Sequence, residues 1–101
     1  MPLPPFLEPV RKNDPDFGKA IEDVYSLAMG EGALDQKTKL LIALAVDAAH
    51  GATQGVANIA RQLRSMGVTD EEIREAIRIA YFAFGNSILA SYSAAFHEEM
   101  F

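Results

Sequence analysis

The chain contains neither cysteine nor tryptophan. Without cysteine it can form no disulfide, thiol peroxidase site, thiolate-bound zinc site or iron–sulfur cluster. The nine basic residues are scattered without a run of Lys or Arg, and the formal net charge is −5. This charge argues against nucleic acid or an anionic membrane as the main partner.

No apolar run approaches the roughly 20 residues that a membrane span requires. The N-terminal sequence MPLPPFLEPV also lacks the charged and then apolar regions of a secretory signal. We therefore expect a cytoplasmic protein. Abundant alanine, few β-branched residues and the absence of any strand pattern favour an all-α fold, and 101 residues suit one domain.

Four of the five prolines lie within residues 1–13. Because proline disrupts both helices and central strands, we predict that residues 1–13 form an extended arm and not a helix. Whether its apolar side chains pack on the domain or on a neighbouring subunit, or whether the terminus frays, stays open. The helical domain is expected over residues 14–101.

Five helices are expected after the arm, and most have clear boundary signals. Asp14 and Pro15 form a typical helix start, and Thr69 with Glu72 has the spacing of a capping box. Gly51 and Gly67 are expected to separate helices. The pair Gly85–Asn86 is expected to end the fourth helix, with Asn86 capping the next. The predicted helices cover residues 15–29, 36–50, 53–66, 70–84 and 87–98.

The second predicted helix carries the apolar run 40–46, so we expect it to be buried on most sides. At about 100° per residue, five of its residues share a stripe roughly 80° wide, and from Leu40 onward every residue outside this stripe is apolar. We call this stripe the polar seam; its members are Gln36, Lys39, Ala43, Asp47 and His50. The apolar stretch 79–84 is likewise expected to be buried, either in the core or against another subunit.

The stretch from Leu34 to Asn86 resembles the carboxymuconolactone decarboxylase family, which includes the alkylhydroperoxidase D-like proteins. The shared features are the LDQKTK start, the LIALA run, the glycine before the next helix, the GVTDEEI turn and the AYFAFG stretch. The resemblance extends over about residues 14–96. It implies an alkylhydroperoxidase D-like helical domain that forms homo-oligomers, often trimers or hexamers.

The redox motif of the peroxidase-type members is missing. Those members have a Glu, a Cys-x-x-Cys and a later His. When the sequences are aligned on Gly51, these positions fall at Leu40, Ala52, Gly55 and Ile59. None of these residues carries a thiol, a base or an acid. Cysteine-dependent peroxidase activity is therefore excluded at the family positions, and a decarboxylase would have to use other residues.

His50 is the first catalytic candidate, with Asp47 one turn earlier on the same face. A histidine with a carboxylate is a minimal acid–base unit near neutral pH; alternatively, His50 only caps the end of its helix. Four further residues are substrate-binding candidates, and three of them have an ordinary structural alternative: an ion pair for Lys39, core packing for Tyr81 and helix capping for Asn86. They are Lys39, Gln54, Tyr81 and Asn86.

No metal or cofactor is expected, because a metal site needs about three convergent ligands. Two functions remain open. The first is a cofactor-free lyase or isomerase acting on a small carboxylate or lactone. The second is a non-catalytic small-molecule-binding or assembly module on the same fold. For either function the expected partners are further copies of the chain and, where one binds, a small molecule.

Overall fold

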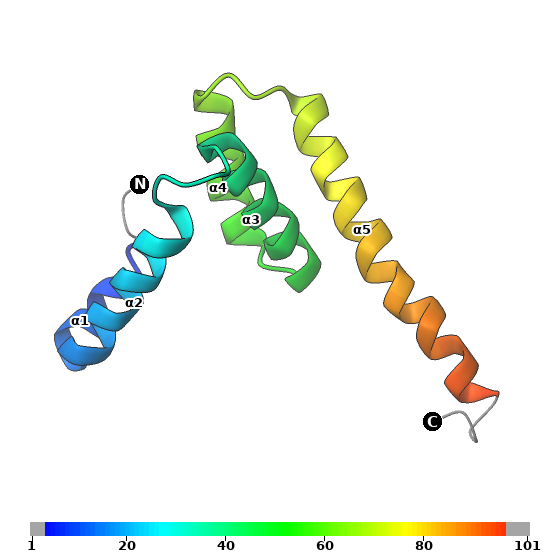
Figure 1. Cartoon of the computed structure of the whole chain (residues 1–101), viewed down its shortest axis with the longest axis horizontal. Coiled ribbons are helices and arrows are strands. Elements are labelled where there is room, and N and C mark those ends of the chain that lie inside the picture. The colour runs from blue at the N-terminus through cyan, green and yellow to red at the C-terminus, as the bar shows by residue number, and fades with distance from the viewer. Residues whose placement is uncertain (1–3, 97–101) are drawn as a thin grey trace. The chain divides into compact units, whose positions relative to one another are not determined.

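The computed structural model describes residues 4–96, and in that range it contains only helices (Figure 1). The α-helices are α1 (Leu7–Asn13), α2 (Pro15–Met29), α3 (Gln36–His50), α4 (Thr53–Ser65) and α5 (Asp70–Tyr92), and the short 3-10 helix η1 (Ser93–Ala95) follows them. The all-α prediction is confirmed. The chain divides into two compact units, residues 1–36 and 37–101.

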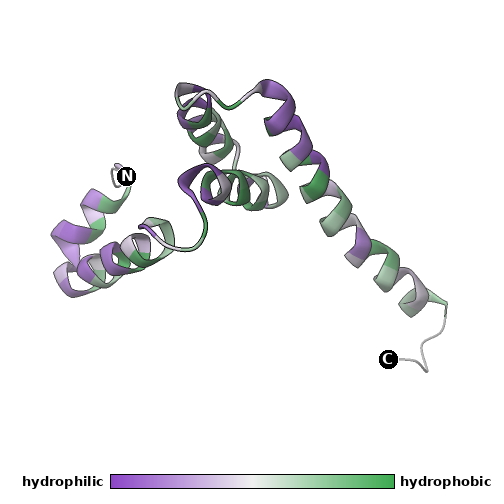
Figure 2. Ribbon diagram, turned by 45° about the horizontal axis from the view of Figure 1, so that its top comes forward, coloured by the Kyte–Doolittle hydropathy of each residue, from purple (hydrophilic) through white to green (hydrophobic). Residues whose placement is uncertain are grey.

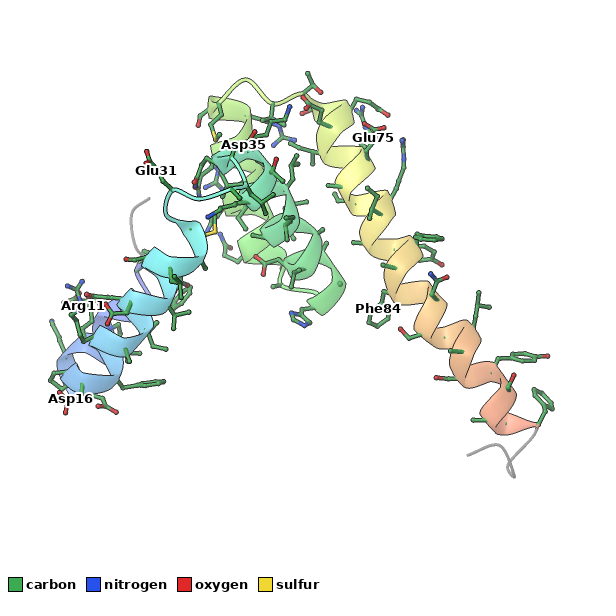
Figure 3. The ribbon with its side chains drawn as sticks, viewed as in Figure 1. Arg11, Asp16, Glu31, Asp35, Glu75 and Phe84 are labelled. Atoms are coloured by element: carbon green, nitrogen blue, oxygen red, sulfur yellow. The ribbon has the colours of Figure 1, made fainter. Side chains whose placement is uncertain are left out.

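In the first unit, α1 and α2 lie side by side. Leu7 is buried, and Arg11 of α1 forms an ion pair with Glu22 of α2, with Nε 2.6 Å from Oε1. Figure 3 shows Arg11 beside α2. A Cβ on Gly18 would lie 2.8 Å from the Cα of Arg11. Gly18 thus lets the two backbones approach closely at this point.

The prediction that residues 1–13 form no helix is wrong for residues 7–13. Pro9 is the third residue of α1, and the first backbone N–H groups of a helix have no acceptor within it. Proline therefore removes no hydrogen bond there. The carbonyls of Pro4 and Pro5 accept from the N–H groups of Leu7 and Glu8. Leu3, another arm residue, lies outside the described residues.

The expected start of α2 is confirmed, since the Asp14 side chain accepts a hydrogen bond from the N–H of Phe17 at 3.3 Å. Gly51 and Gly67 adopt positive φ of 74° and 84°, and they separate α3 from α4 and α4 from α5. Both glycines therefore act as predicted, because few other residues adopt this conformation without strain.

The second unit has a small core formed by α3, α4 and the start of α5. Its buried side chains are Leu40, Leu44, Ala60, Leu63, Val68 and Ile73. The expectation that α3 is buried on most sides is wrong for the single chain, because Ile42 and Val46 remain half exposed. Only one stripe of α3 faces the core.

The predicted break at Gly85–Asn86 is also wrong. The helix α5 continues through both residues to Tyr92, and Gly85 does not have a positive φ. A lone glycine costs a helix roughly 1 kcal/mol relative to alanine and does not end it. Asn86 therefore caps no helix, and the predicted last helix is the end of α5 followed by η1. Residues 97 and 98 of that prediction lie outside the described residues.

The second half of α5 is exposed. Figure 2 shows the helix changing from hydrophilic in its first turns to mostly hydrophobic later. The large apolar residues from Ile79 to Phe96 all keep at least 57% of their surface exposed. The expectation that this stretch lies in the core of the chain is therefore wrong, and its burial against another subunit stays a prediction.

Candidate functional site

The candidate residues of the polar seam lie along one helix, α3. Lys39 and Asp47 are half buried, whereas His50 is exposed at the last residue of the helix. With a rise of about 1.5 Å per residue, Lys39 and His50 are separated by roughly 16 Å along the axis. The seam is thus a line of polar groups, and its two ends are too far apart to hold the same small group.

Asp47 lies against the first turn of α4. If Gly55 carried a Cβ, that atom would overlap Oδ2 of Asp47 and lie 3.0 Å from its Cγ. The carboxylate therefore occupies the space of the side chain that Gly55 lacks. This placement is electrostatically favourable because the first turn of a helix carries partial positive charge.

The first turn of α4 also lacks a cap of its own. Its N-cap residue is Ala52, whose side chain accepts no hydrogen bond. The main chain joins the two helices instead, since the N–H of Ala52 donates to the carbonyl of Asp47 at 2.9 Å. The main chain of Asp47 thus helps to hold the turn between α3 and α4, and its side chain lies against Gly55.

Asp47 and His50 form no ion pair with each other in the part of the chain that the structure describes. They share a face of α3, but the carboxylate lies toward Gly55. Gln54, in the first turn of α4, donates through Nε2 to Oδ1 of Asn58 at 3.2 Å. The turn between α3 and α4 therefore brings His50, Asp47 and Gln54 into one short segment without joining them.

Tyr81 and Asn86 lie on α5 and are both exposed, Tyr81 at 83%. Five residues apart, they differ by roughly 140° around the helix, so they lie on different faces. They do not converge on one point, and their role in binding stays a prediction.

Electrostatic interactions concentrate where α5 begins. Thr69 accepts from the N–H of Glu72 at 3.2 Å, and Glu72 Oε1 accepts from the N–H of Thr69 at 3.1 Å. The predicted capping box is therefore confirmed. The other carboxylate oxygen of Glu72 pairs with Lys37 of α3.

These partners lower the pKa of three neighbouring carboxyls. Lys37 and then the N–H of Thr69 lower the pKa of Glu72. The guanidinium of Arg64 lowers the pKa of Asp70, and Arg74 followed by Arg78 does the same for Glu71. All three are ionised at neutral pH and act as structural anchors for the start of α5.

The described residues contain no group of three or more His, Asp or Glu side chains that could hold a metal ion. Likewise, no helix within residues 4–96 is both long and apolar enough to cross a membrane.

Sequence reasoning missed the contact between Asp47 and Gly55. One signal was available: glycine is a poor choice for a first helical turn unless something approaches its backbone closely. What approaches it depends on the packing of two helices, which the sequence pattern does not specify. The peroxidase-type members of the family have a cysteine at the position of Gly55. In this chain the carboxylate of Asp47 occupies the space that a side chain at this position would take.

Comparisons with known proteins agree with this fold. The chain is 33% identical over 79 residues to Uncharacterized protein MJ1511 of Methanocaldococcus jannaschii. This alignment covers 78% of this chain and 74% of that protein. A structural-genomics crystal structure of a Methanobacterium thermoautotrophicum protein superposes with a TM-score of 0.80 at 26% identity. The match covers 91% of this chain and 99% of that one.

The sequence also matches a family profile over most of its length. The sequence profile described as "Carboxymuconolactone decarboxylase family" matches residues 15–98, which is most of the chain. The matched region includes all of α2 to α5 and therefore both the polar seam and the turn between α3 and α4. This chain belongs to the carboxymuconolactone decarboxylase family.

Proposed function

We propose that this protein is a cofactor-free lyase or isomerase that acts on a small carboxylate or lactone, with His50 as the acid–base group. The observation that carries the proposal is the state of His50. Its imidazole is exposed at the end of α3 and makes no hydrogen bond within residues 4–96. An accessible imidazole near neutral pH is available to transfer a proton to or from a substrate.

In the lyase version, a carboxylate leaves as carbon dioxide and its electron pair moves into the adjoining unsaturated lactone. The imidazolium of His50 then donates a proton to carbon and becomes neutral. In the isomerase version, neutral His50 removes a proton from one carbon and returns it to another. Neither version requires a thiol, and the chain has no cysteine.

Asp47 is assigned a supporting role. Its carboxylate lies against Gly55 in the first turn of α4, and Asp47 stands one turn before His50 on the same face of α3. Gln54 is the substrate-binding candidate nearest in sequence to His50, and it offers an amide to a carboxylate or lactone oxygen. Lys39, Tyr81 and Asn86 would act in the same site only if a second copy contributes them.

The experiment incubates the purified protein with a panel of small unsaturated lactone carboxylates in deuterated buffer and follows the substrates by proton NMR. We expect turnover or deuterium incorporation that falls at least 100-fold in His50→Gln, because general acid–base groups typically contribute that much or more. Arg61→Ala, on the exposed face of α4, is the control and should keep its activity. Turnover that survives in His50→Gln would rule out the proposed role.

A second candidate is a non-catalytic small-molecule-binding module on the same fold. The absence of an ion pair between Asp47 and His50 favours it, because an unoriented histidine is a poor catalyst. This candidate predicts that the same panel shifts protein NMR resonances near the turn between α3 and α4 without any substrate turning over.

A further inference from the structure

The side of α3 that faces away from the core carries a line of four residues with a charged end, an apolar middle and a histidine. At about 100° per residue they fall within a sector roughly 80° wide. We call this line the α3 stripe; it consists of Lys39, Ile42, Val46 and His50. The buried Leu40 and Leu44 lie on the other side of the helix.

The middle of the α3 stripe is apolar and open. Ile42 and Val46 are each 50% exposed, and Ala49 beside them is exposed as well. Two half-exposed aliphatic side chains offer far less than the roughly 800 Å² that each partner contributes to a stable protein interface. A strip one side chain wide instead suits a single hydrocarbon chain.

The two ends of the α3 stripe differ in charge. Lys39 brings a positive charge to the first turn of α3, where the helix macrodipole also favours an anion. Its ammonium group has three N–H donors, so it can bind a ligand's carboxylate alongside contacts within the chain. His50 ends the helix, where the macrodipole disfavours an anion. A carboxylate ligand is therefore bound in one direction only.

The distance between the two ends sets the length of the ligand. Lys39 and His50 are separated by roughly 16 Å along the axis, too far to contact one small group. An extended hydrocarbon chain advances roughly 1.25 Å per bond, given bonds of about 1.5 Å and angles near 111°. The stem of Lys39 can itself lie along the apolar strip and shorten the gap. About eight to twelve bonds therefore span the stripe.

We propose that the α3 stripe binds an elongated carboxylate, with the anion at Lys39, the hydrocarbon chain along Ile42 and Val46, and the far end at His50. This proposal rests on the proposed function, because it names the substrate class for the same histidine: an unsaturated lactone that carries its carboxylate on an apolar chain. The anchored carboxylate is too far from His50 to be the group lost as carbon dioxide. Such a substrate fits the isomerase version, in which His50 removes a proton from one lactone carbon and returns it to another.

The first test measures binding, whether or not turnover occurs. The intact isotope-labelled protein is titrated with butanoate, hexanoate, octanoate and decanoate and followed by NMR. Affinity should rise about twofold for each added CH₂ group, because one side of the hydrocarbon chain leaves water. Decanoate should shift the amide resonances from Lys39 to His50, whereas butanoate should shift only those near Lys39. Affinity that does not depend on chain length would overturn the proposal.

Lys39→Met keeps an apolar stem and removes the charge. It should weaken decanoate binding about fivefold and leave the binding of uncharged decanol unchanged. Lys19→Met is the matched control, because Lys19 lies in α2 and pairs with Asp23 at 2.6 Å. It should bind decanoate as the wild type does. Equal weakening by both lysine variants would show that net charge attracts the anion and would overturn the proposal.

Val46→Ser interrupts the apolar strip. It should weaken decanoate binding at least threefold and leave butanoate binding unchanged. Leu27→Ser, at an 87% exposed position of α2, is the control and should change neither. Circular dichroism checks that both variants are folded. Undiminished decanoate binding in Val46→Ser, or shifts confined to α5, would place the hydrocarbon chain elsewhere and overturn the proposal.

The last test separates this proposal from catalysis at His50. Unsaturated lactones that carry a carboxylate on a chain of about three or about ten carbon atoms are incubated with the protein. We expect KM to be at least tenfold lower for the longer substrate. Lys39→Met should raise its KM at unchanged kcat, because uniform binding is lost, whereas His50→Gln should lower kcat.

The possible failures of the two proposals differ. Binding that depends on chain length and on Lys39, without any turnover, would support the α3 stripe and refute catalysis at His50. Turnover that depends on His50 but on neither chain length nor Lys39 would overturn the stripe and leave the proposed function standing.

Discussion

The second unit has a packed part, residues 37–78, and a bare part, residues 79–96. The two parts differ in the contacts that their helix ends and glycines make with the rest of the chain. The packed part has six buried apolar side chains, a capping box and ion pairs such as that of Arg64 with Asp70, 2.9 Å apart. The bare part has none of these, although it is more hydrophobic in sequence. Hydrophobic residues alone do not make a core; they need a packed partner surface.

Two glycines, one in each part, show the same difference in packing. Gly55 and Gly85 both have ordinary helical backbone. Gly55 is crowded by the Asp47 carboxylate, whereas Gly85 faces open space. The first glycine is explained by a contact within the chain, whereas no contact among the described residues calls for the second.

The largest expected effect is on the free energy of unfolding, because only the packed part has a core. Leu63 is fully buried, so Leu63→Ala should reduce the free energy of unfolding by about 2–5 kcal/mol through lost burial and a residual cavity. Ile79→Ala, in the bare part, should change it by less than about 0.5 kcal/mol, because Ile79 is mostly exposed. Urea unfolding followed by circular dichroism measures both. Similar losses of unfolding free energy in Leu63→Ala and Ile79→Ala would contradict the division into a packed and a bare part.

Gly55→Ala should destabilise by about 1–3 kcal/mol, because its new methyl group overlaps the Asp47 carboxylate. In an Asp47→Ala background the same change should become neutral or stabilising, since the space is then free. Gly85→Ala is the matched control and should not destabilise the helix. An undiminished cost of Gly55→Ala without the carboxylate would show that something other than Asp47 excludes the methyl group.

Thr69→Ala removes the cap from the start of α5 and should cost about 1 kcal/mol. Ser91→Ala makes a similar chemical change in the bare half of the same helix and should have an effect within about 0.5 kcal/mol. Chemical denaturation of both variants, side by side, measures the difference. Equal effects would mean that the capping box contributes little to the stability of the helix.

The smallest expected effect is on the stability of the protein at acidic pH. Because its folded pKa is lowered by Lys37, Glu72 binds fewer protons in the folded than in the unfolded state just below its ordinary pKa of 4.5. The stability that it contributes is present above that pH and is lost as the pH falls through the folded pKa. Glu72→Gln should therefore flatten the loss of stability in acid, as urea midpoints across the pH range would show.

Glu75→Gln provides the comparison for the acid experiment, since Glu75 has no ion-pair partner within the part of the chain that the structure describes. It should leave the acid dependence close to that of the wild type. If Glu75→Gln and Glu72→Gln flatten the profile equally, the ion pair with Lys37 is not its cause.

The sequence by itself determined the features whose causes lie within a few residues. Asp14 and Thr69 cap the helices that follow them, and Gly51 and Gly67 reverse the chain, because each effect involves hydrogen bonds or dihedral angles over one turn. The all-α class and the family followed from longer patterns of the same kind. Leu40, Ala52, Gly55 and Ile59 showed from their chemistry alone that the thiol motif is missing.

Only the tertiary structure decided where the carboxylate of Asp47 lies, because its position depends on how closely α3 approaches Gly55. Only the structure also showed that α5 continues through Gly85, where the sequence predicted a helix end. Likewise, only the structure showed that α1 includes Pro9. Burial was also decided at this level: Ile42 and Ile79 belong to apolar runs, yet only a packed neighbour can remove such side chains from water.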